Sequence, residues 1–133
     1  MAPRPQHLHY RGAWLAIGYA LVGATAWGSL HPDPPGWAFL AGDKLLHGAT
    51  YALLTFWFGQ LYPGWRRELG LVAAFALLGA ALEVAQAWWS VYRHFDLADA
   101  AASALGALAA WALLRTPVGR ALERLDARIA ASA

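Results

Sequence analysis

Four long apolar runs, separated by short polar breaks, constrain this chain more than any other feature of its sequence. The runs cover about residues 13–30, 44–62, 69–89 and 97–114. Each is close to the roughly 20 residues that an α-helix needs to cross a hydrocarbon core of about 30 Å. The break at residues 31–35 (HPDPP) contains three prolines and cannot continue a helix. The sequence therefore predicts an all-α membrane protein with four transmembrane helices, forming one domain over residues 1–133.

The composition excludes several other classes of protein. Of the 133 residues, 59% are hydrophobic and only 14% are charged, whereas a soluble domain carries about a quarter charged residues. The net charge of +2 is spread without a continuous basic face, so no nucleic-acid partner is expected. The absence of cysteine excludes disulfides and thiolate metal sites.

The positions of the arginines predict an orientation in the membrane. Basic residues gather before the first run, between the second and third runs, and after the fourth: Arg4, Arg11, Arg66, Arg67, Arg115, Arg120, Arg124 and Arg128. Cytoplasmic loops are enriched in such residues, so both termini are expected inside and the loops 31–43 and 90–98 outside. The first run, with Arg11 before it and Ala24-Thr25-Ala26 near its end, would also suit a cleavable signal. We expect it to be retained as a helix.

The segment after the fourth run has helical periodicity of its own. Thr116 is a suitable cap and Pro117 a suitable first-turn residue, and apolar side chains then recur opposite arginines. This pattern predicts an amphipathic interfacial helix over about residues 117–131, lying on the inner leaflet. A frayed, solvated tail is the alternative.

The polar side chains of the apolar runs converge near the outer face. Asp43, His47 and Tyr51 share one face at the start of the second run, because they are four residues apart. His47 lies about 6 Å below Asp43, at a rise of about 1.5 Å per residue. Glu83 and Gln86 are one turn apart near the outer end of the third run. The topology therefore predicts that His47, Glu83 and, on the fourth run, Ser103 lie at a similar depth.

The start of the fourth run adds residues to the same end of the protein. Arg93 precedes the run, Asp96 and Asp99 open it, where acidic side chains favour the helix dipole, and Ser103 lies one turn deeper. Ionisable groups inside a membrane are costly, so they must face a partner or water, and they usually have a function. Structural hydrogen bonding between helices is the competing interpretation.

Three kinds of chemistry are open to such a site. His47 and Glu83 could act as an acid/base pair, and Lys44, His47 and Arg93 could hold the phosphate or carboxylate of a headgroup. No nucleophile elbow or phosphate loop is present, so enzymatic activity is left open. No cofactor is expected. A divalent metal held by Asp43, His47, Glu83 and Asp99 is a weaker alternative, because no short ligand motif is present.

The same residues resemble a known family. The stretch Asp43-Lys44-Leu45-Leu46-His47, followed by Tyr51, is similar to the D-K-x-x-H-x-x-x-Y opening of VanZ-like membrane proteins. Glu83 and Gln86 resemble the E-x-x-Q step of that family. Arg93, Asp96, Asp99 and Gly106 resemble its closing R…D-x-x-A-N-x-x-G segment, except that the family's asparagine falls at Ser103. The resemblance covers about residues 43–114.

The resemblance implies a multi-pass protein of the bacterial cytoplasmic membrane, in a family named for a link to teicoplanin resistance. With the polar residues above, it leads to the hypothesis of an outer-leaflet pocket that binds an amphiphile, a lipid headgroup or a lipid-linked envelope precursor. The residues expected to bind are Asp43, Lys44, Tyr51, Gln86, Arg93, Asp96, Asp99 and Ser103. A structural or accessory membrane protein is the alternative, and an ion pathway is disfavoured because the inner halves of the runs are apolar. Faces of small residues would allow a homodimer.

Overall fold

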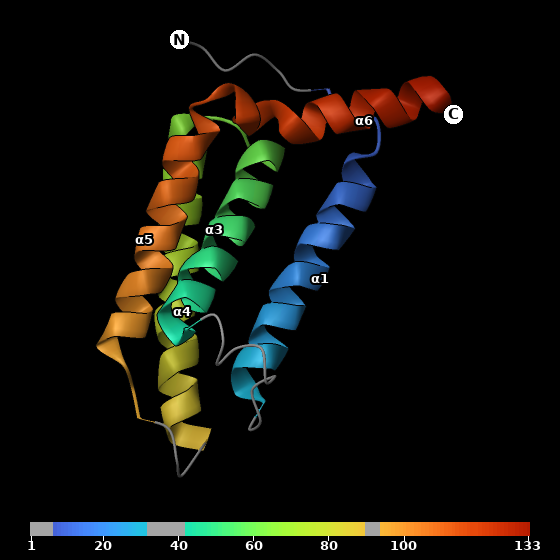
Figure 1. Ribbon diagram of the computed structural model, residues 1–133. Coiled ribbons are helices and arrows are strands. Elements are labelled where there is room, and N and C mark those ends of the chain that lie inside the picture. Colours follow the sequence, from blue (N-terminus) through green and yellow to red (C-terminus); the bar gives the residue numbers. More distant parts are fainter. Residues whose placement is uncertain (1–6, 32–41, 90–93) are drawn as a thin grey trace.

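The computed structural model describes residues 7–31, 42–89 and 94–133, and of Asp43 the backbone alone. Every regular element in these ranges is helical. The elements are α1 (Arg11–Leu30), α3 (Asp43–Leu61), α4 (Trp65–Trp89), α5 (Leu97–Leu114), the 3₁₀ helix η1 (Pro117–Arg120) and α6 (Ala121–Ser132). The four long helices run alternately in opposite directions, and α6 lies across the end where α1 begins and α5 ends (Figure 1). We call this the α6 end and the opposite one the cluster end.

The helices α3 and α5 run in the same direction and approach each other through two glycines. A Cβ atom on Gly106 would overlap the backbone carbonyl of Gly48. Contact between backbones at such small residues is a common way for helices to associate in a membrane, where no hydrophobic force drives them together. This contact fixes how far along α3 the first turns of α5 lie.

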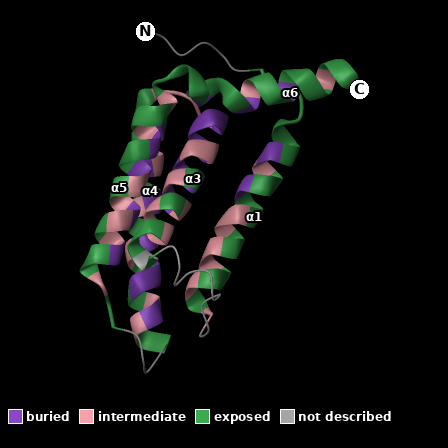
Figure 2. Cartoon of the chain, in the orientation of Figure 1, coloured by how far each residue is buried: buried purple, intermediate pink, exposed green. Residues whose placement is uncertain are grey.

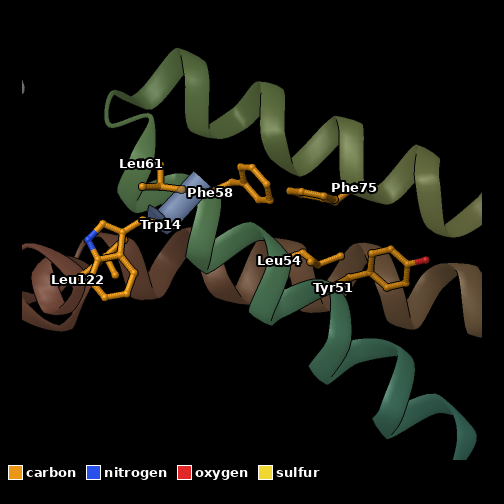
Figure 3. Packing of buried hydrophobic residues seen from close by; sticks show 7 residues of the cluster. All are labelled: Trp14, Tyr51, Leu54, Phe58, Leu61, Phe75 and Leu122. Atoms are coloured by element: carbon orange, nitrogen blue, oxygen red, sulfur yellow. The ribbon is translucent and has the colours of Figure 1, made fainter. Parts of the chain in front are cut away.

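The buried apolar side chains form a cluster along the middle of the bundle and towards the α6 end (Figure 3). Its members come from α1, α3, α4 and α6, and Phe58 of α3 packs against Phe75 of α4 with ring centroids 5.6 Å apart. Gly18 of α1 leaves room for the Phe58 ring, because a Cβ there would lie 2.9 Å from it. The cluster therefore joins α1 and α6 to α3 and α4.

The outward faces of the long helices are also apolar. Leu53, Leu77 and Leu105 are exposed in the middle of α3, α4 and α5 (Figure 2 shows the exposed residues in green). Three helices, α1, α4 and α5, are long and apolar enough to cross a membrane, and at most 28% of any such stretch is buried within the protein. Helices that are hydrophobic on all sides belong in a large core or in a membrane. These features indicate a membrane protein.

Helix α4 begins at Trp65, before the predicted start of its apolar run at residue 69. The carboxylate of Glu68 accepts a hydrogen bond of 3.0 Å from the backbone N–H of Gly64, which caps the first turn. Glu68 is buried and forms an ion pair with Arg115, at the C-terminal end of α5. This pair joins α4 and α5 at the α6 end.

Helix α6 is attached to the bundle by a buried carboxylate that the sequence analysis did not single out. Asp126 accepts hydrogen bonds from the backbone N–H groups of His9 (2.6 Å) and Tyr10 (3.0 Å) and from the indole N–H of Trp14 (2.7 Å). Burial opposes ionisation of this carboxyl, but these hydrogen bonds outweigh it and lower its pKa to about 2. The predicted interfacial helix is therefore docked on the start of α1.

Candidate functional site

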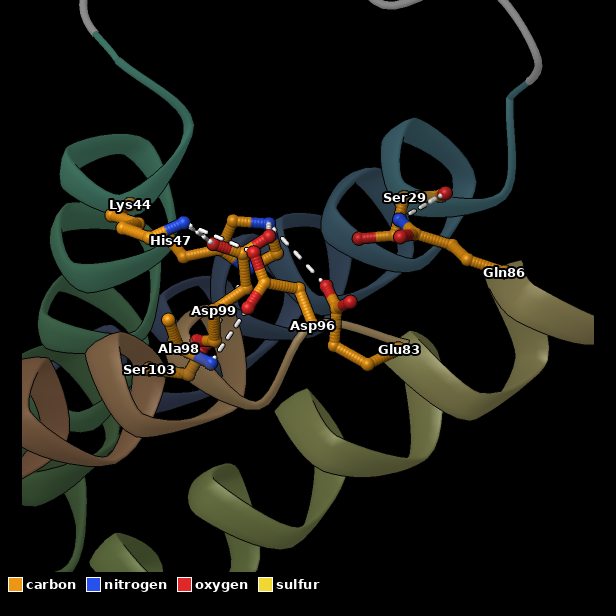
Figure 4. A network of polar contacts seen from close by, with 9 residues as sticks. All are labelled: Ser29, Lys44, His47, Glu83, Gln86, Asp96, Ala98, Asp99 and Ser103. Carbon is orange, nitrogen blue, oxygen red and sulfur yellow. Dashed lines mark hydrogen bonds and ion pairs between the residues drawn. The ribbon is translucent and has the colours of Figure 1, made fainter. Parts of the chain in front are cut away.

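The cluster end carries a polar cluster made by three helices (Figure 4). We use this name for His47, Glu83, Asp99 and Ser103, together with Lys44 and Asp96 at its edge. The first two turns of α3 carry Lys44 and His47, the part of α4 near the cluster end carries Glu83, and the first two turns of α5 carry Asp99 and Ser103. The expected convergence of His47, Glu83 and Ser103 is therefore found in the structure.

His47 lies between two buried carboxylates. Its Nε2 atom is 3.5 Å from Glu83 Oε1 and 4.0 Å from Asp99 Oδ2. The side chains of His47, Glu83 and Asp99 are 12%, 3% and 6% exposed. Charged groups this far from water interact strongly with one another, because the local dielectric constant is low.

Ser103 closes the inner side of the cluster. Its hydroxyl is fully buried, donates a hydrogen bond of 3.0 Å to the backbone carbonyl of Asp99, and lies 3.4 Å from His47 Nδ1. Gly79 of α4 makes this position possible, because a Cβ there would lie 2.9 Å from that of Ser103. The lack of a side chain at Gly79 thus lets α4 approach α5 at Ser103.

Lys44 lies at the open side of the cluster. Its ammonium donates hydrogen bonds to Asp96 Oδ2 (3.0 Å) and Asp99 Oδ1 (3.1 Å), and about half of its side chain is exposed. Asp96 also caps α5 by accepting a hydrogen bond of 2.8 Å from the N–H of Ala98. The hydrogen bond from Lys44, followed by that from Ala98, lowers the pKa of Asp96. Lys44 therefore joins α3 to α5, and a phosphate would have to compete with two carboxylates for it.

Two further predicted site residues lie elsewhere in the same half of the protein. Gln86 donates a hydrogen bond of 2.5 Å to the backbone carbonyl of Ser29, and so links α4 to the end of α1 (Figure 4). Tyr51 is buried in the apolar cluster, where its ring lies beside Gly79. Arg93 and the side chain of Asp43, which were also predicted to bind, lie outside the described residues.

The arrangement has two chemical capacities. His47 and Glu83 could exchange a proton after a small movement, because their 3.5 Å separation is slightly longer than a hydrogen bond. His47, Glu83 and Asp99 could also hold a metal ion, because each offers one ligand atom and these atoms lie within 4.8 Å of one another. Three of the four metal ligands that the sequence offered as an alternative are thus found together. The side chain of the fourth, Asp43, lies outside the described residues.

A cavity of about 520 Å³ lies away from this chemistry, between α1, α3 and α4 towards the α6 end. Its lining is mostly apolar and includes Tyr19, Phe58 and Phe75, with Arg67 at one side. We place the candidate site at the polar cluster, because an apolar opening between membrane helices suits lipid chains and offers little chemistry.

Sequence reasoning missed the polar groups of the α6 end, namely Gln60, Glu68 and Asp126. Gln60 accepts a hydrogen bond of 2.8 Å from the backbone N–H of Leu122 at the start of α6. A signal for Asp126 was present, because it lies four residues after Leu122 and so on the apolar face of the tail helix.

Comparisons of the chain with protein-family models, with curated proteins and with solved structures give no match.

Proposed function

We propose that this chain is a bacterial membrane protein with four transmembrane helices, whose polar cluster binds the headgroup of an amphiphile from the outer leaflet. The headgroup would belong to a membrane lipid or a lipid-linked envelope precursor. The observation that carries the proposal is the gathering of His47, Glu83 and Asp99 at one end of an otherwise apolar bundle. Ionisable groups in a membrane interior are costly and usually mark a binding site or pathway.

The direction of the helices supports α3 as the fourth span. Helices α1 and α4 both run from the α6 end to the cluster end (Figure 1), so a chain that crosses the membrane in both must return between them. Helix α3 lies between them in sequence, and its 19 residues extend about 28 Å at 1.5 Å per residue. Helix α3 is less hydropathic than α1, α4 and α5 because it carries Lys44 and His47 of the cluster and also Gln60.

The distribution of charges and tryptophans supports the orientation. Arg66 and Arg67 lie at the α6 end, as do the arginines of α6, and such residues mark the cytoplasmic side. Trp27, Trp88 and Trp89 are exposed at the cluster end, where a belt of aromatic side chains would meet the outer interface. The polar cluster would then face the outside of the cell.

The edge of the cluster supports entry of a headgroup from that side. Lys44 and Asp96 are half exposed, whereas Glu83 and Asp99 behind them are buried and the side chain of His47 is only 12% exposed. A headgroup that displaces the Lys44–Asp96 contact would gain a cation and reach His47. If the resemblance to VanZ-like proteins holds, the cellular role of this binding would be resistance to teicoplanin-type antibiotics. Acid/base chemistry at His47 and Glu83 would be a further step, and binding alone is the function that we propose.

Lipid retention tests the proposal. The chain is purified from bacterial membranes in a mild detergent, and its bound lipids are identified by native mass spectrometry. We expect the wild type to retain a specific amphiphile, and Glu83→Gln and His47→Gln to lose it. Glu123→Gln, which removes a partly exposed carboxylate of α6 far from the cluster, is the matched control. If the two cluster variants retain the same lipids but melt at lower temperature, the cluster only holds the helices together, as the alternative function requires.

Site-specific labelling tests the orientation. The chain has no cysteine, so a single one introduced by His94→Cys or Ser132→Cys is unique. A membrane-impermeant maleimide should label the first variant in intact cells and the second only after permeabilisation. The opposite pattern would reverse the topology and place the cluster in the cytoplasmic leaflet.

A further inference from the structure

We propose that His47, Glu83 and Asp99 bind one divalent cation of the zinc or manganese type. The three residues belong to α3, α4 and α5, so that the ion would join the three helices at the cluster end. One imidazole with two carboxylates is a donor set that suits Zn²⁺ and Mn²⁺.

The distances between the ligand atoms fit such an ion. Zinc binds histidine nitrogen and carboxylate oxygen at about 2.0–2.2 Å, which places neighbouring ligands of a tetrahedral site about 3.4 Å apart. His47 Nε2 lies 3.5 Å from Glu83 Oε1 and 4.0 Å from Asp99 Oδ2. The three ligand atoms are within 4.8 Å of one another, so shifts of less than about 1 Å would complete the site.

The contacts of Ser103 orient the imidazole of His47 for metal binding. The hydroxyl of Ser103 donates its proton to the backbone carbonyl of Asp99, so that towards His47 Nδ1 it can act as an acceptor. An Nδ1–H group facing that oxygen leaves the lone pair of Nε2 directed at the two carboxylates. Metal-bound histidines are held in this way, with the second ring nitrogen donating to a neighbouring oxygen.

Lys44 orients the carboxylate of Asp99 for metal binding. It binds Oδ1 of Asp99, whereas Oδ2 is the atom nearest to His47. One carboxylate oxygen is thus held by an ammonium and the other remains directed at the shared position. A contact that orients a ligand without occupying the position of the ion is typical of the shell around a metal site.

The proposal competes with a simpler arrangement, in which His47 is protonated and forms ion pairs with Glu83 and Asp99. Both arrangements place a positive charge between Nε2 and the carboxylates. A divalent cation neutralises two buried carboxylates at once, whereas a proton on His47 neutralises one. Buried charges are stable in proteins when they are paired or coordinate a metal.

The ion would also explain how a cluster rich in carboxylates accepts a phosphate. Among the described side chains, Glu83, Asp96 and Asp99 face Lys44 and His47, so an anion gains little from these side chains alone. A bound Zn²⁺ or Mn²⁺ has coordination positions left for a phosphate oxygen. This last step, the recruitment of a phosphate-bearing headgroup, rests on the function proposed above.

Titration with the metal alone tests the site. The full chain in detergent, stripped with a chelator, is titrated with Zn²⁺ and then Mn²⁺ by calorimetry, and the bound metal is counted by elemental analysis. We expect about one ion per chain, bound at least about tenfold more weakly by Glu83→Gln and His47→Gln. Glu123→Gln should bind like the wild type. Wild type that binds neither metal, or cluster variants that bind as tightly as it does, would overturn the proposal.

Two further measurements separate this proposal from folding defects and from the proposed function. Stoichiometric Zn²⁺ should raise the melting temperature of the unmodified wild-type chain, and no change would contradict a site that joins three helices. Lipid retention is then measured with and without the chelator. If the chain binds the metal but retains no lipid, the metal site stands and the proposed binding of a headgroup is rejected. Retention that the chelator does not alter would reject the recruitment of phosphate by the ion.

Discussion

Replacing Asp126 with alanine should release α6 from the bundle while leaving the long helices folded. The carboxylate accepts hydrogen bonds from the backbone N–H groups of His9 and Tyr10 and from the indole of Trp14, at 2.6–3.0 Å. It also lies at the N-terminal end of α1, where a negative charge is favoured by the helix dipole. The methyl group of alanine replaces none of these interactions.

The size of the effect follows from the surroundings of the three donors. Trp14 is 8% exposed, and a buried donor left without an acceptor costs about 1–3 kcal/mol. The N–H groups of His9 and Tyr10 lie nearer to water and can be hydrated, so each loses only its net hydrogen-bond energy, on the order of 1 kcal/mol. The lower end of these values sums to about 3 kcal/mol, which would increase the undocked fraction of α6 by at least on the order of 100-fold.

Limited trypsin digestion measures this fraction. Arg124 and Arg128 are cleavage sites within α6, and cleavage follows the undocked population when docking is fast relative to cleavage. We expect Asp126→Ala to be cut on the order of 100 times faster than the wild type. Glu123→Gln is the control, because its exposed ion pair with Arg120 contributes little. If Asp126→Ala were cut within about threefold of the wild type, the carboxylate would not hold the tail.

Two more predictions concern acid and the helix contact. Because the pKa of Asp126 is lowered from 3.8 to about 2, its contribution is complete above about pH 4 and is lost as the pH falls towards 2. Hydrogen exchange of α6, taken relative to the intrinsic exchange rate at each pH, should therefore rise over that range in the wild type and stay flat in Asp126→Asn. Gly106→Ala should lower the melting temperature of the protein, since its Cβ would meet the Gly48 carbonyl. Gly23→Ala, with nothing within 4 Å, should leave the melting temperature unchanged or raise it.

Each of these two predictions has a result that contradicts it. Acid-induced exchange that is equal in the wild type and in Asp126→Asn would assign the change to another group. Equal melting temperatures for Gly106→Ala and Gly23→Ala would mean that α3 and α5 are not held at the separation seen here.

The positions of the helices and of the polar residues along them follow from local sequence. Helix α5 was predicted over residues 97–114 and occupies them, because Asp96 is a strong cap and a threonine-proline step follows Arg115. The predicted start of the third apolar run, at residue 69, was later than the true start of α4 at Trp65, because the apolar pattern begins only after Arg66 and Arg67. The helical repeat also placed His47 and Glu83 near the same end of the bundle.

The sequence by itself determined that this chain forms apolar helices of membrane length, with its ionisable residues near their ends, because periodicity and hydrophobicity are local properties. Only the tertiary structure decided which of those residues meet. The Gly48–Gly106 contact sets Asp99 and Ser103 beside His47, whereas the rotation of α4 directs Gln86 to α1 and Glu83 to the cluster. Asp126 was assigned to no site because its donors lie more than 110 residues away in the chain. Such contacts depend on helix rotation and separation, which are fixed by packing between distant segments.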